Sequence, residues 1–131
     1  NYTQDGRLAK LRKLKPSVYS ELVTLSTMET DESLEYLDNR LSRYSMQNGK
    51  CSVTGIFLRT QDVHCHHIIP RKFGGTDEFD NLVIIHKWVH RLIHAKTKET
   101  IKEYLQLLQL TNKQMKKLNK YRLECNLTEF H

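Results

Sequence analysis

The chain has 131 residues, of which 38% are hydrophobic and 27% are charged, a length and composition that suit one small folded domain and exclude a fibrous or disordered chain. It carries 21 Lys and Arg against 15 Asp and Glu, which gives a formal net charge of +6. This excess of positive charge favours a polyanion such as DNA or RNA as the partner, and the alternative is a basic protein without such a partner.

The first thirty residues are basic, and we expect them to form a connector or a DNA-binding segment. Leucines three residues apart predict an amphipathic turn that ends at Pro16: Leu8, Leu11 and Leu14. A helix is predicted from Ser17, as its N-cap, to residue 25, and its apolar face consists of Val18, Leu22 and Leu25.

A second helix is predicted across residues 31–48. Asp31 and Glu32 suit the positive end of its dipole, and Asn48-Gly49 is a typical helix end. Apolar residues recur at helical spacing and predict a stripe that faces the core: Leu34, Leu37, Leu41 and Tyr44.

Residues 51–95 change to a strand-like pattern. Short β-rich pieces flank a Thr54-Gly55 turn, and the segment DVHCHHIIPRK (residues 62–72) follows. The glycines and aspartates of RKFGGTDEFDN predict a loop, NLVIIHK predicts a buried strand, and HKWVHRLIHA predicts a helix. The result is a strand–loop–strand–helix unit, which is a ββα arrangement.

Two more helices are predicted after residue 96. Thr97 and Thr111 suit as their N-caps, and Thr111 with Gln114 has the pattern of a capping box. Five basic residues make the last helix positively charged: Lys113, Lys116, Lys117, Lys120 and Arg122.

Histidines flank the ββα unit on both sides. His90 and His94 are four residues apart, so on a helix they share one face, where two imidazoles can bind the same ion. His66 and His67 are adjacent in an extended segment and project to opposite sides of it. We therefore expect one of these two to bind a metal and the other to act as a base beside it. The alternative is a pair of partly exposed strand histidines without a ligand.

The combined motif HHIIPRKFGGTDEFDNLVIIHKWVHRLIH resembles the HNH nucleases in the order and spacing of its His-His pair, Gly-Gly loop, Asp-Asn-Leu and His-x-x-x-His helix. The resemblance implies an α+β fold with a ββα-metal (HNH) core and flanking helices, mostly helical outside the core. It implies that His66, His90 and His94 bind one divalent cation, that His67 is the general base, and that Asn81 pins the loop and orients this base. Magnesium or manganese is the implied working ion, and zinc is a candidate for the resting site.

The implied activity is that of a metal-dependent endonuclease, which hydrolyses a phosphodiester bond of double-stranded DNA. In this reaction His67 takes a proton from water, the hydroxide attacks phosphorus in line, and the products carry 5′-phosphate and 3′-hydroxyl ends. Five residues around the motif are expected to bind nucleic acid: His64, Arg71, Lys72, Lys87 and Arg91.

A longer stretch, from about residue 34 to residue 127, resembles more narrowly the C-terminal endonuclease region of group II intron-encoded reverse transcriptase and maturase proteins. The segments that carry this resemblance are DNRLSRYSMQNGKCSVTG, HCHHIIP, GGTDEFDNLV, VHRLIHA and TIKEYL. It implies the target-strand-nicking domain used in intron homing, with intron RNA and a reverse transcriptase domain as partners in the full-length protein. The expected division is a basic connector or DNA-binding segment at residues 1–30 and an HNH endonuclease domain at residues 31–131, with the ββα-metal core at about 51–95 and C-terminal helices at 97–125.

The chain has three cysteines, Cys51, Cys65 and Cys125, an odd number without paired spacing. This content favours a reducing compartment, and we expect a cytoplasmic protein associated with the nucleoid. Many HNH nucleases are braced by two Cys-x-x-Cys pairs around a zinc ion, but three cysteines cannot form a four-cysteine site, so no such structural zinc is expected. No apolar run approaches the length of a membrane span, so no membrane partner is expected.

Two alternatives to a nuclease remain open. The first is a non-catalytic nucleic-acid-binding module that is stabilised by zinc, in which an unligated histidine beside a closed metal site would have no task. The second is a vestigial maturase piece that binds RNA as well as DNA and does not nick. The presence of every residue expected for the chemistry weighs against this second alternative.

Overall fold

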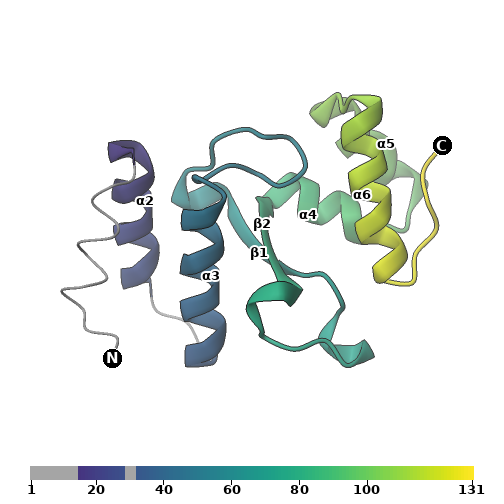
Figure 1. Cartoon of the computed structure of the whole chain (residues 1–131). Coiled ribbons are helices and arrows are strands. Elements are labelled where there is room, and N and C mark those ends of the chain that lie inside the picture. The colour runs from purple at the N-terminus through teal and green to yellow at the C-terminus, as the bar shows by residue number, and fades with distance from the viewer. Residues whose placement is uncertain (1–14, 29–31) are drawn as a thin grey trace.

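The computed structural model describes residues 15–28 and 32–131. The helices and strands follow in the order α2 (Pro16–Thr27), α3 (Leu34–Met46), β1 (Val63–His67), β2 (Leu82–His86), α4 (Lys87–His94), α5 (Lys98–Leu108) and α6 (Asn112–Glu124). Short 3₁₀ turns precede the strands and divide the loop between them, at Thr60–Asp62, Arg71–Phe73 and Phe79–Asn81. Helices α2 and α3 lie at one end of the molecule, the sheet lies in the middle, and α4 to α6 lie at the other end (Figure 1). The predicted α+β fold with flanking helices is confirmed.

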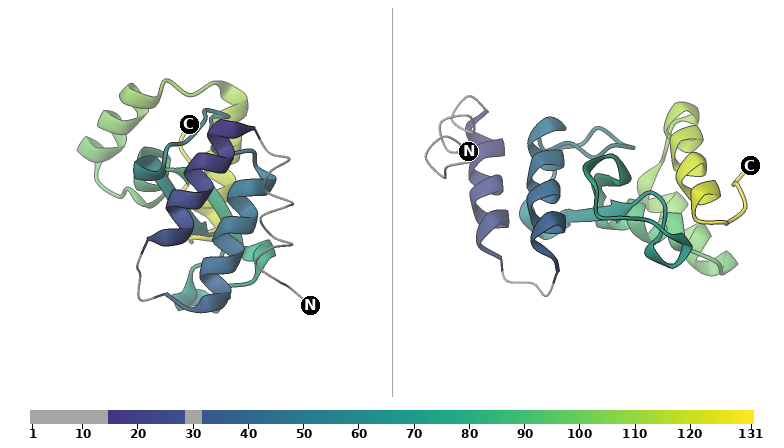
Figure 2. Two further views of the ribbon diagram at one scale, coloured as in Figure 1. Left: turned by 90° about the vertical axis from the view of Figure 1, so that its left-hand side faces the viewer. Right: turned by 60° about the horizontal axis from the view of Figure 1, so that its bottom comes forward.

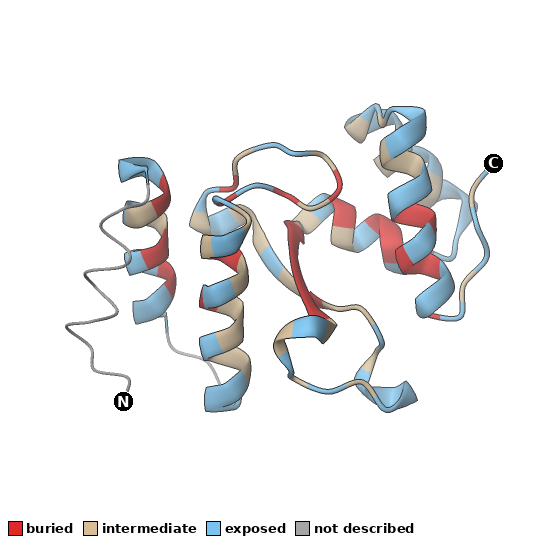
Figure 3. Ribbon diagram, viewed as in Figure 1, coloured by how far each residue is buried: buried red, intermediate tan, exposed pale blue. Residues whose placement is uncertain are grey.

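The sheet consists of β1 and β2, which pair antiparallel with Val63 opposite His86 and His67 opposite Leu82. Residues 82–85 of β2 are all buried, because α3 packs on one side of the sheet and α4 on the other (Figure 3). A strand that is covered on both faces reads as a continuous apolar run, as LVII does here. Side chains alternate along β1, so His66 faces α4 and His67 faces α3.

Helix α2 begins two residues earlier than predicted. Lys15 is its N-cap and Pro16 is its first residue, which corrects the prediction that Ser17 caps it. Proline suits this position because the first helical N–H has no partner inside the helix. The predicted apolar face is buried in the core: Val18, Leu22 and Leu25. The amphipathic turn predicted at residues 8–14 lies outside the described residues.

Helix α3 begins at Leu34, after the predicted start at residue 31. Its N-cap is Ser33, whose Oγ accepts a hydrogen bond from the Tyr36 N–H at 3.1 Å. Leu41 and Tyr44 are buried as predicted, whereas Leu34 is 74% exposed and lies outside the apolar stripe. The buried residues of α3 are therefore Leu41 and Tyr44, and Leu37 is half-buried.

The segment between α3 and β1 binds the edge of β2 that does not pair with β1. The Gln47 side chain accepts from the Ile84 N–H and donates to the Ile84 carbonyl, both at 2.9 Å, and the Ser52 N–H donates to the same carbonyl at 3.0 Å. Gly49 has a φ of +70°, and a Cβ there would lie 2.8 Å from the Tyr44 hydroxyl. Only glycine fits at this point, where the chain turns against the buried tyrosine.

The last two helices have the predicted caps. The Thr97 Oγ1 accepts from the Thr100 N–H at the start of α5, and Thr111 with Gln114 forms a complete capping box at the start of α6. Both helices pack beside α4 at the same end of the molecule (Figure 2). In the described part of the chain, no helix is long and apolar enough to span a membrane.

Candidate metal centre

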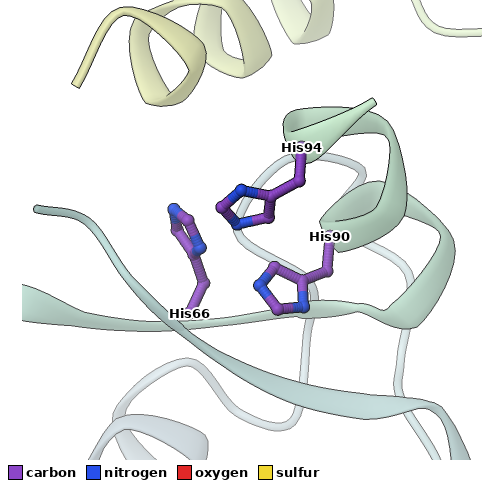
Figure 4. Close-up of side chains that lie close together, drawn as sticks. All are labelled: His66, His90 and His94. Carbon is purple, nitrogen blue, oxygen red and sulfur yellow. The ribbon is translucent and has the colours of Figure 1, made fainter. Parts of the chain in front are cut away.

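Three histidines from β1 and α4 point toward one another (Figure 4). One ring nitrogen from each of His66, His90 and His94 lies within 4.8 Å of the other two, and their ring centroids are 4.9–5.4 Å apart. The four-residue spacing places His90 and His94 on one face of α4, while the rest of the helix packs into the core through Val89, Leu92 and Ile93. The structure thus brings together the three residues that were predicted as ligands.

The burial of His66 within this three-histidine group favours metal binding. His66 is 1% exposed, and its Nε2 has no hydrogen-bond partner among the described residues. Burial lowers the pKa of His66 to about 3 and that of His90 to about 4, and the neighbouring imidazoles add to both shifts. Burial also lowers the pKa of His94. At neutral pH the three rings are therefore uncharged and keep a lone pair, as a metal ligand requires.

A divalent cation fits this donor set. An unpaired, fully buried ring nitrogen costs free energy, and a metal ion at the centre of the group would satisfy it. Three imidazoles are a known protein ligand set for a catalytic divalent ion, and they leave coordination positions for water and substrate. A closed structural site needs a fourth protein ligand, which the group does not include.

His64 lies against one of these ligands on the same side of β1. Its Nδ1 is 2.9 Å from the Nδ1 of His90, so one of the two nitrogens donates a proton to the other. This contact leaves the Nε2 of His90 free for a metal. Hydrogen bonds to the second ring nitrogen are the usual way in which proteins orient metal-bound histidines. His64 was predicted to bind nucleic acid, and it is exposed beside the three-histidine group.

On the opposite side of β1, His67 contacts a carboxylate. Its Nε2 lies 2.8 Å from the Asp77 Oδ1, and its ring stacks on Tyr36 with centroids 5.4 Å apart and planes at 13°. Hydrogen bonds, above all the one from His67, lower the pKa of Asp77 to about 2. Sequence reasoning missed both Asp77 and Tyr36, because Asp77 was interpreted only as part of a loop composition and Tyr36 only as part of a helix.

Asn81 holds the loop that carries Asp77. Its side chain bonds both backbone groups of Ile69, accepting from the N–H at 2.9 Å and donating to the carbonyl at 3.0 Å, and it donates to the Thr76 carbonyl at 2.8 Å. Gly75 allows the loop to close, since a Cβ there would lie 1.7 Å from the Ile69 carbonyl oxygen. Asn81 therefore acts on the loop between His67 and Asp77, and none of its described hydrogen bonds goes to His67 itself.

The predicted nucleic-acid-binding residues lie in different surroundings. A hollow of about 390 Å³ beside the three-histidine group is lined by Lys87, Arg91 and Lys96, together with His64, His90 and His94. A second hollow of about 380 Å³ is lined by Lys72, Lys96 and His94 among others. Lys96 lines both hollows and was not predicted. Arg71 instead pairs with Glu32 and Asp77 on the other side of β1.

A buried arginine from α6 supports the end of α4. Arg122 is 3% exposed. Its Nη1 donates at 2.8–3.1 Å to three carbonyls at the C-terminus of α4: Leu92, Ile93 and Ala95. Its Nε donates to the Thr128 carbonyl at 2.7 Å, and its guanidinium lies over the Phe130 ring. Arg122 was predicted only as one of five basic residues of this helix, and its burial depends on the tertiary structure.

The three cysteines are free thiols that do not belong to the three-histidine group. The Cys51 sulfur accepts from the Thr54 N–H and from the His86 N–H at 3.4–3.5 Å, so it joins the turn to the start of α4. Burial raises the pKa of Cys65 to about 11, which keeps it protonated at neutral pH.

One comparison with known proteins gave a match. Residues 50–96 match the family model of the HNH endonucleases. No curated protein and no solved structure matches the chain. The matched segment contains His66, His67, Asn81, His90 and His94, and it ends two residues after α4. The match supports an HNH domain in this chain, a family whose domains typically bind one divalent metal ion and act as nucleases on DNA.

Proposed function

We propose that this chain is a metal-dependent DNA endonuclease that cuts one strand and leaves 5′-phosphate and 3′-hydroxyl ends. The observation that carries the proposal is that the two adjacent histidines of β1 have different neighbours. His66 faces two further histidines of α4, and His67 faces a carboxylate. A structural metal site would need the first arrangement but not the second. A hydrolytic site needs both, because it must hold a cation and activate a water molecule.

In the proposed reaction, His66, His90 and His94 hold the cation, which when bound supplies positive charge to the phosphate and to the charge that develops during cleavage. His67 accepts a proton from water, the oxygen attacks phosphorus in line, and the bond to the 3′ oxygen breaks. Asn81 holds the loop that brings Asp77 to His67. Magnesium or manganese is the proposed working ion, and zinc is a suitable probe because imidazole nitrogens bind it well.

Double-stranded DNA is the proposed substrate. The two hollows that meet at His94 are lined by cations, of which Lys72, Arg91 and Lys96 are exposed. Such cations bind the phosphates of a strand without reading its sequence. Lys87 lies 3.4 Å from the Asp62 carboxylate, and Arg71 is paired with two carboxylates. We therefore expect a larger contribution to DNA binding from Lys72, Arg91 and Lys96 than from Lys87 and Arg71.

The biological setting that we propose is a group II intron-encoded protein, on the resemblance of residues 34–127 to its endonuclease region. In such a protein the cut would supply the 3′-hydroxyl from which a reverse transcriptase copies intron RNA. We propose residues 31–131 as the nuclease domain and residues 1–30 as a connector, although α2 contributes Val18, Leu22 and Leu25 to the same core. The proposed location remains the cytoplasm, at the nucleoid.

The test is nicking of supercoiled plasmid by the purified chain with magnesium, manganese, zinc or a chelator. His67→Ala is the test variant, and His131→Ala is the control because this histidine is exposed at the end of the chain. We expect metal-dependent nicks that DNA ligase can reseal, which reports 5′-phosphate and 3′-hydroxyl ends. His67→Ala should lower the rate by about 10²–10⁴-fold, the usual contribution of a general base, and His131→Ala should not.

Two results would replace the proposal by one of the alternatives. DNA binding that depends on metal, without nicking in any condition and on any intron target, would favour the zinc-stabilised binding module. Binding of RNA and DNA with similar affinity and no nicking would favour a vestigial maturase piece. In both cases circular dichroism of the same samples shows whether the chain is folded.

A further inference from the structure

The carboxylate of Asp77 is surrounded by hydrogen-bond donors. Its Oδ1 lies 2.8 Å from the His67 Nε2 and 3.1 Å from the Arg71 Nη2, and its Oδ2 accepts from the Ser33 hydroxyl at 2.9 Å. These contacts hold the pKa of Asp77 at about 2, so the carboxylate is ionised and can only accept hydrogen bonds. The hydrogen between Asp77 and His67 therefore resides on the Nε2 of the imidazole.

The remaining nitrogen of His67 is left free by this arrangement. In a neutral imidazole with its hydrogen on Nε2, the lone pair is on Nδ1. No hydrogen bond joins Nδ1 to another described residue, and the side chain is 16% exposed. Tyr36 stacks on one face of the ring. The Tyr36 hydroxyl is itself fixed, because it donates to the Cys65 carbonyl at 3.2 Å.

His67 is also close to the three-histidine group. His67 directly follows His66 in β1, and His66 is one of the three histidines. The proposed proton acceptor is therefore adjacent in the chain to a proposed metal ligand. An acceptor of this kind needs a defined direction for its lone pair, and the contacts of the ring provide one.

We propose that Asp77 is a positioning residue which fixes His67 as the Nε2–H tautomer, so that Nδ1 accepts the proton from the attacking water. This inference rests on the proposed function. In the step, an O–H bond of water breaks, an Nδ1–H bond forms, and the imidazolium is stabilised by the adjacent carboxylate. Asp77 keeps its charge and takes no proton. A carboxylate has the same task in the serine protease triad, where replacement by an amide gives the wrong tautomer and costs about 10⁴-fold in kcat.

A purely structural ion pair is the rival explanation, in which Asp77 only joins the loop to β1. This rival predicts that loss of Asp77 lowers stability but does not change the tautomer or kcat of the folded protein. Two measurements distinguish the explanations. One is the tautomer of His67 by NMR, and the other is whether replacement of Asp77 changes kcat or KM. Asp80→Asn is the matched control, because Asp80 is in the same loop and its side chain is fully exposed.

The first measurement is the tautomer of His67 in the metal-free wild-type chain, by NMR of the imidazole nitrogens with ¹⁵N-labelled histidine and His67→Ala for assignment. We expect hydrogen on Nε2 and a lone pair on Nδ1. A wild-type ring with its hydrogen on Nδ1 would overturn the inference, whether or not any variant folds.

The second measurement compares plasmid nicking by Asp77→Ala, Asp77→Asn and Asp80→Asn. Asp77→Ala should give a mixture of tautomers and lower kcat by about 10²–10⁴-fold with unchanged KM. Asp77→Asn can donate its amide N–H to the His67 Nε2 and so favour the other tautomer, and it should lose at least as much activity. If the wild-type chain nicks DNA and Asp77→Ala has the same kcat, the inference about Asp77 is wrong and the proposed function stands. A folded wild-type chain that never nicks DNA overturns the proposed function and this inference with it.

Discussion

The two sides of β1 give adjacent histidines opposite environments. On the α4 side, His66 is buried among other imidazoles, and burial with their mutual repulsion keeps the group uncharged. On the α3 side, His67 lies against the ionised carboxylate of Asp77. A metal ligand must offer a lone pair, whereas a base must be able to become positively charged. Strand alternation thus lets two identical side chains perform different chemistry one residue apart.

The two sides also differ in how they are supported. The α4 side depends on a buried cation, Arg122, which bonds the carbonyls at the end of the helix. The α3 side depends on Arg71, whose side chain is 50% exposed and which pairs with Glu32 and Asp77. Buried charge-assisted bonds are costly to break, while exposed ion pairs contribute little because water replaces them. We therefore expect the α4 side to control stability and the α3 side to control turnover.

The largest expected effect is on the free energy of unfolding in Arg122→Met. This change removes the donor for four carbonyls at the end of α4 and in the C-terminal segment, so we expect a loss of about 3–5 kcal/mol. Arg71→Met is the matched control, with an expected loss below about 1 kcal/mol. Urea unfolding followed by fluorescence of the single tryptophan, Trp88 in α4, measures both. Equal losses would contradict the difference in support between the two sides.

The next effect concerns metal affinity in His94→Ala. His94 is exposed, so its loss should change the free energy of unfolding by less than about 0.5 kcal/mol. It should nevertheless weaken zinc binding by more than about 100-fold, because even the loss of a contact to a ligand costs about 10–100-fold. Titration calorimetry with zinc measures the affinity, and His67→Ala should keep it. A similar loss of affinity in His67→Ala would show that both sides of β1 bind the metal.

The elements that carry the histidines were predictable from the sequence because they depend on local patterns. The LVII run, the four-residue spacing of His90 and His94, and the capping residues each predict structure within a short window. The partners of these elements were not predictable. Asp77 meets His67 only because Asn81 and Gly75 close a loop of ten residues, and Arg122 meets α4 across 27–30 residues. Contacts of this kind depend on tertiary packing, and the spacing of residues within a short segment does not predict them.

A smaller effect on metal affinity is expected in His64→Ala. The Nδ1 of His64 lies 2.9 Å from the Nδ1 of His90, so its loss should leave the ligand ring free to rotate. Removal of such an outer contact typically lowers metal affinity by about 10–100-fold, which is less than the loss expected in His94→Ala. Zinc titration of the two variants side by side gives this order. A loss in His64→Ala that equals or exceeds the loss in His94→Ala would indicate that His64 binds the metal directly.

The smallest effect separates the two contacts of Tyr36 on the α3 side. Tyr36→Phe keeps the ring that stacks on His67 and removes only the hydrogen bond to the Cys65 carbonyl, so we expect a loss of about 1 kcal/mol in the free energy of unfolding and an unchanged kcat. Tyr36→Leu removes the stacked ring as well and should lower kcat, because the imidazole can then turn. Plasmid nicking by the two variants, with urea unfolding of each, measures both quantities. If Tyr36→Phe lowers kcat as far as Tyr36→Leu, the hydroxyl rather than the stacked ring orients His67. Helix α3 would then hold the base through the hydrogen bond from Tyr36 to the Cys65 carbonyl in the backbone of β1.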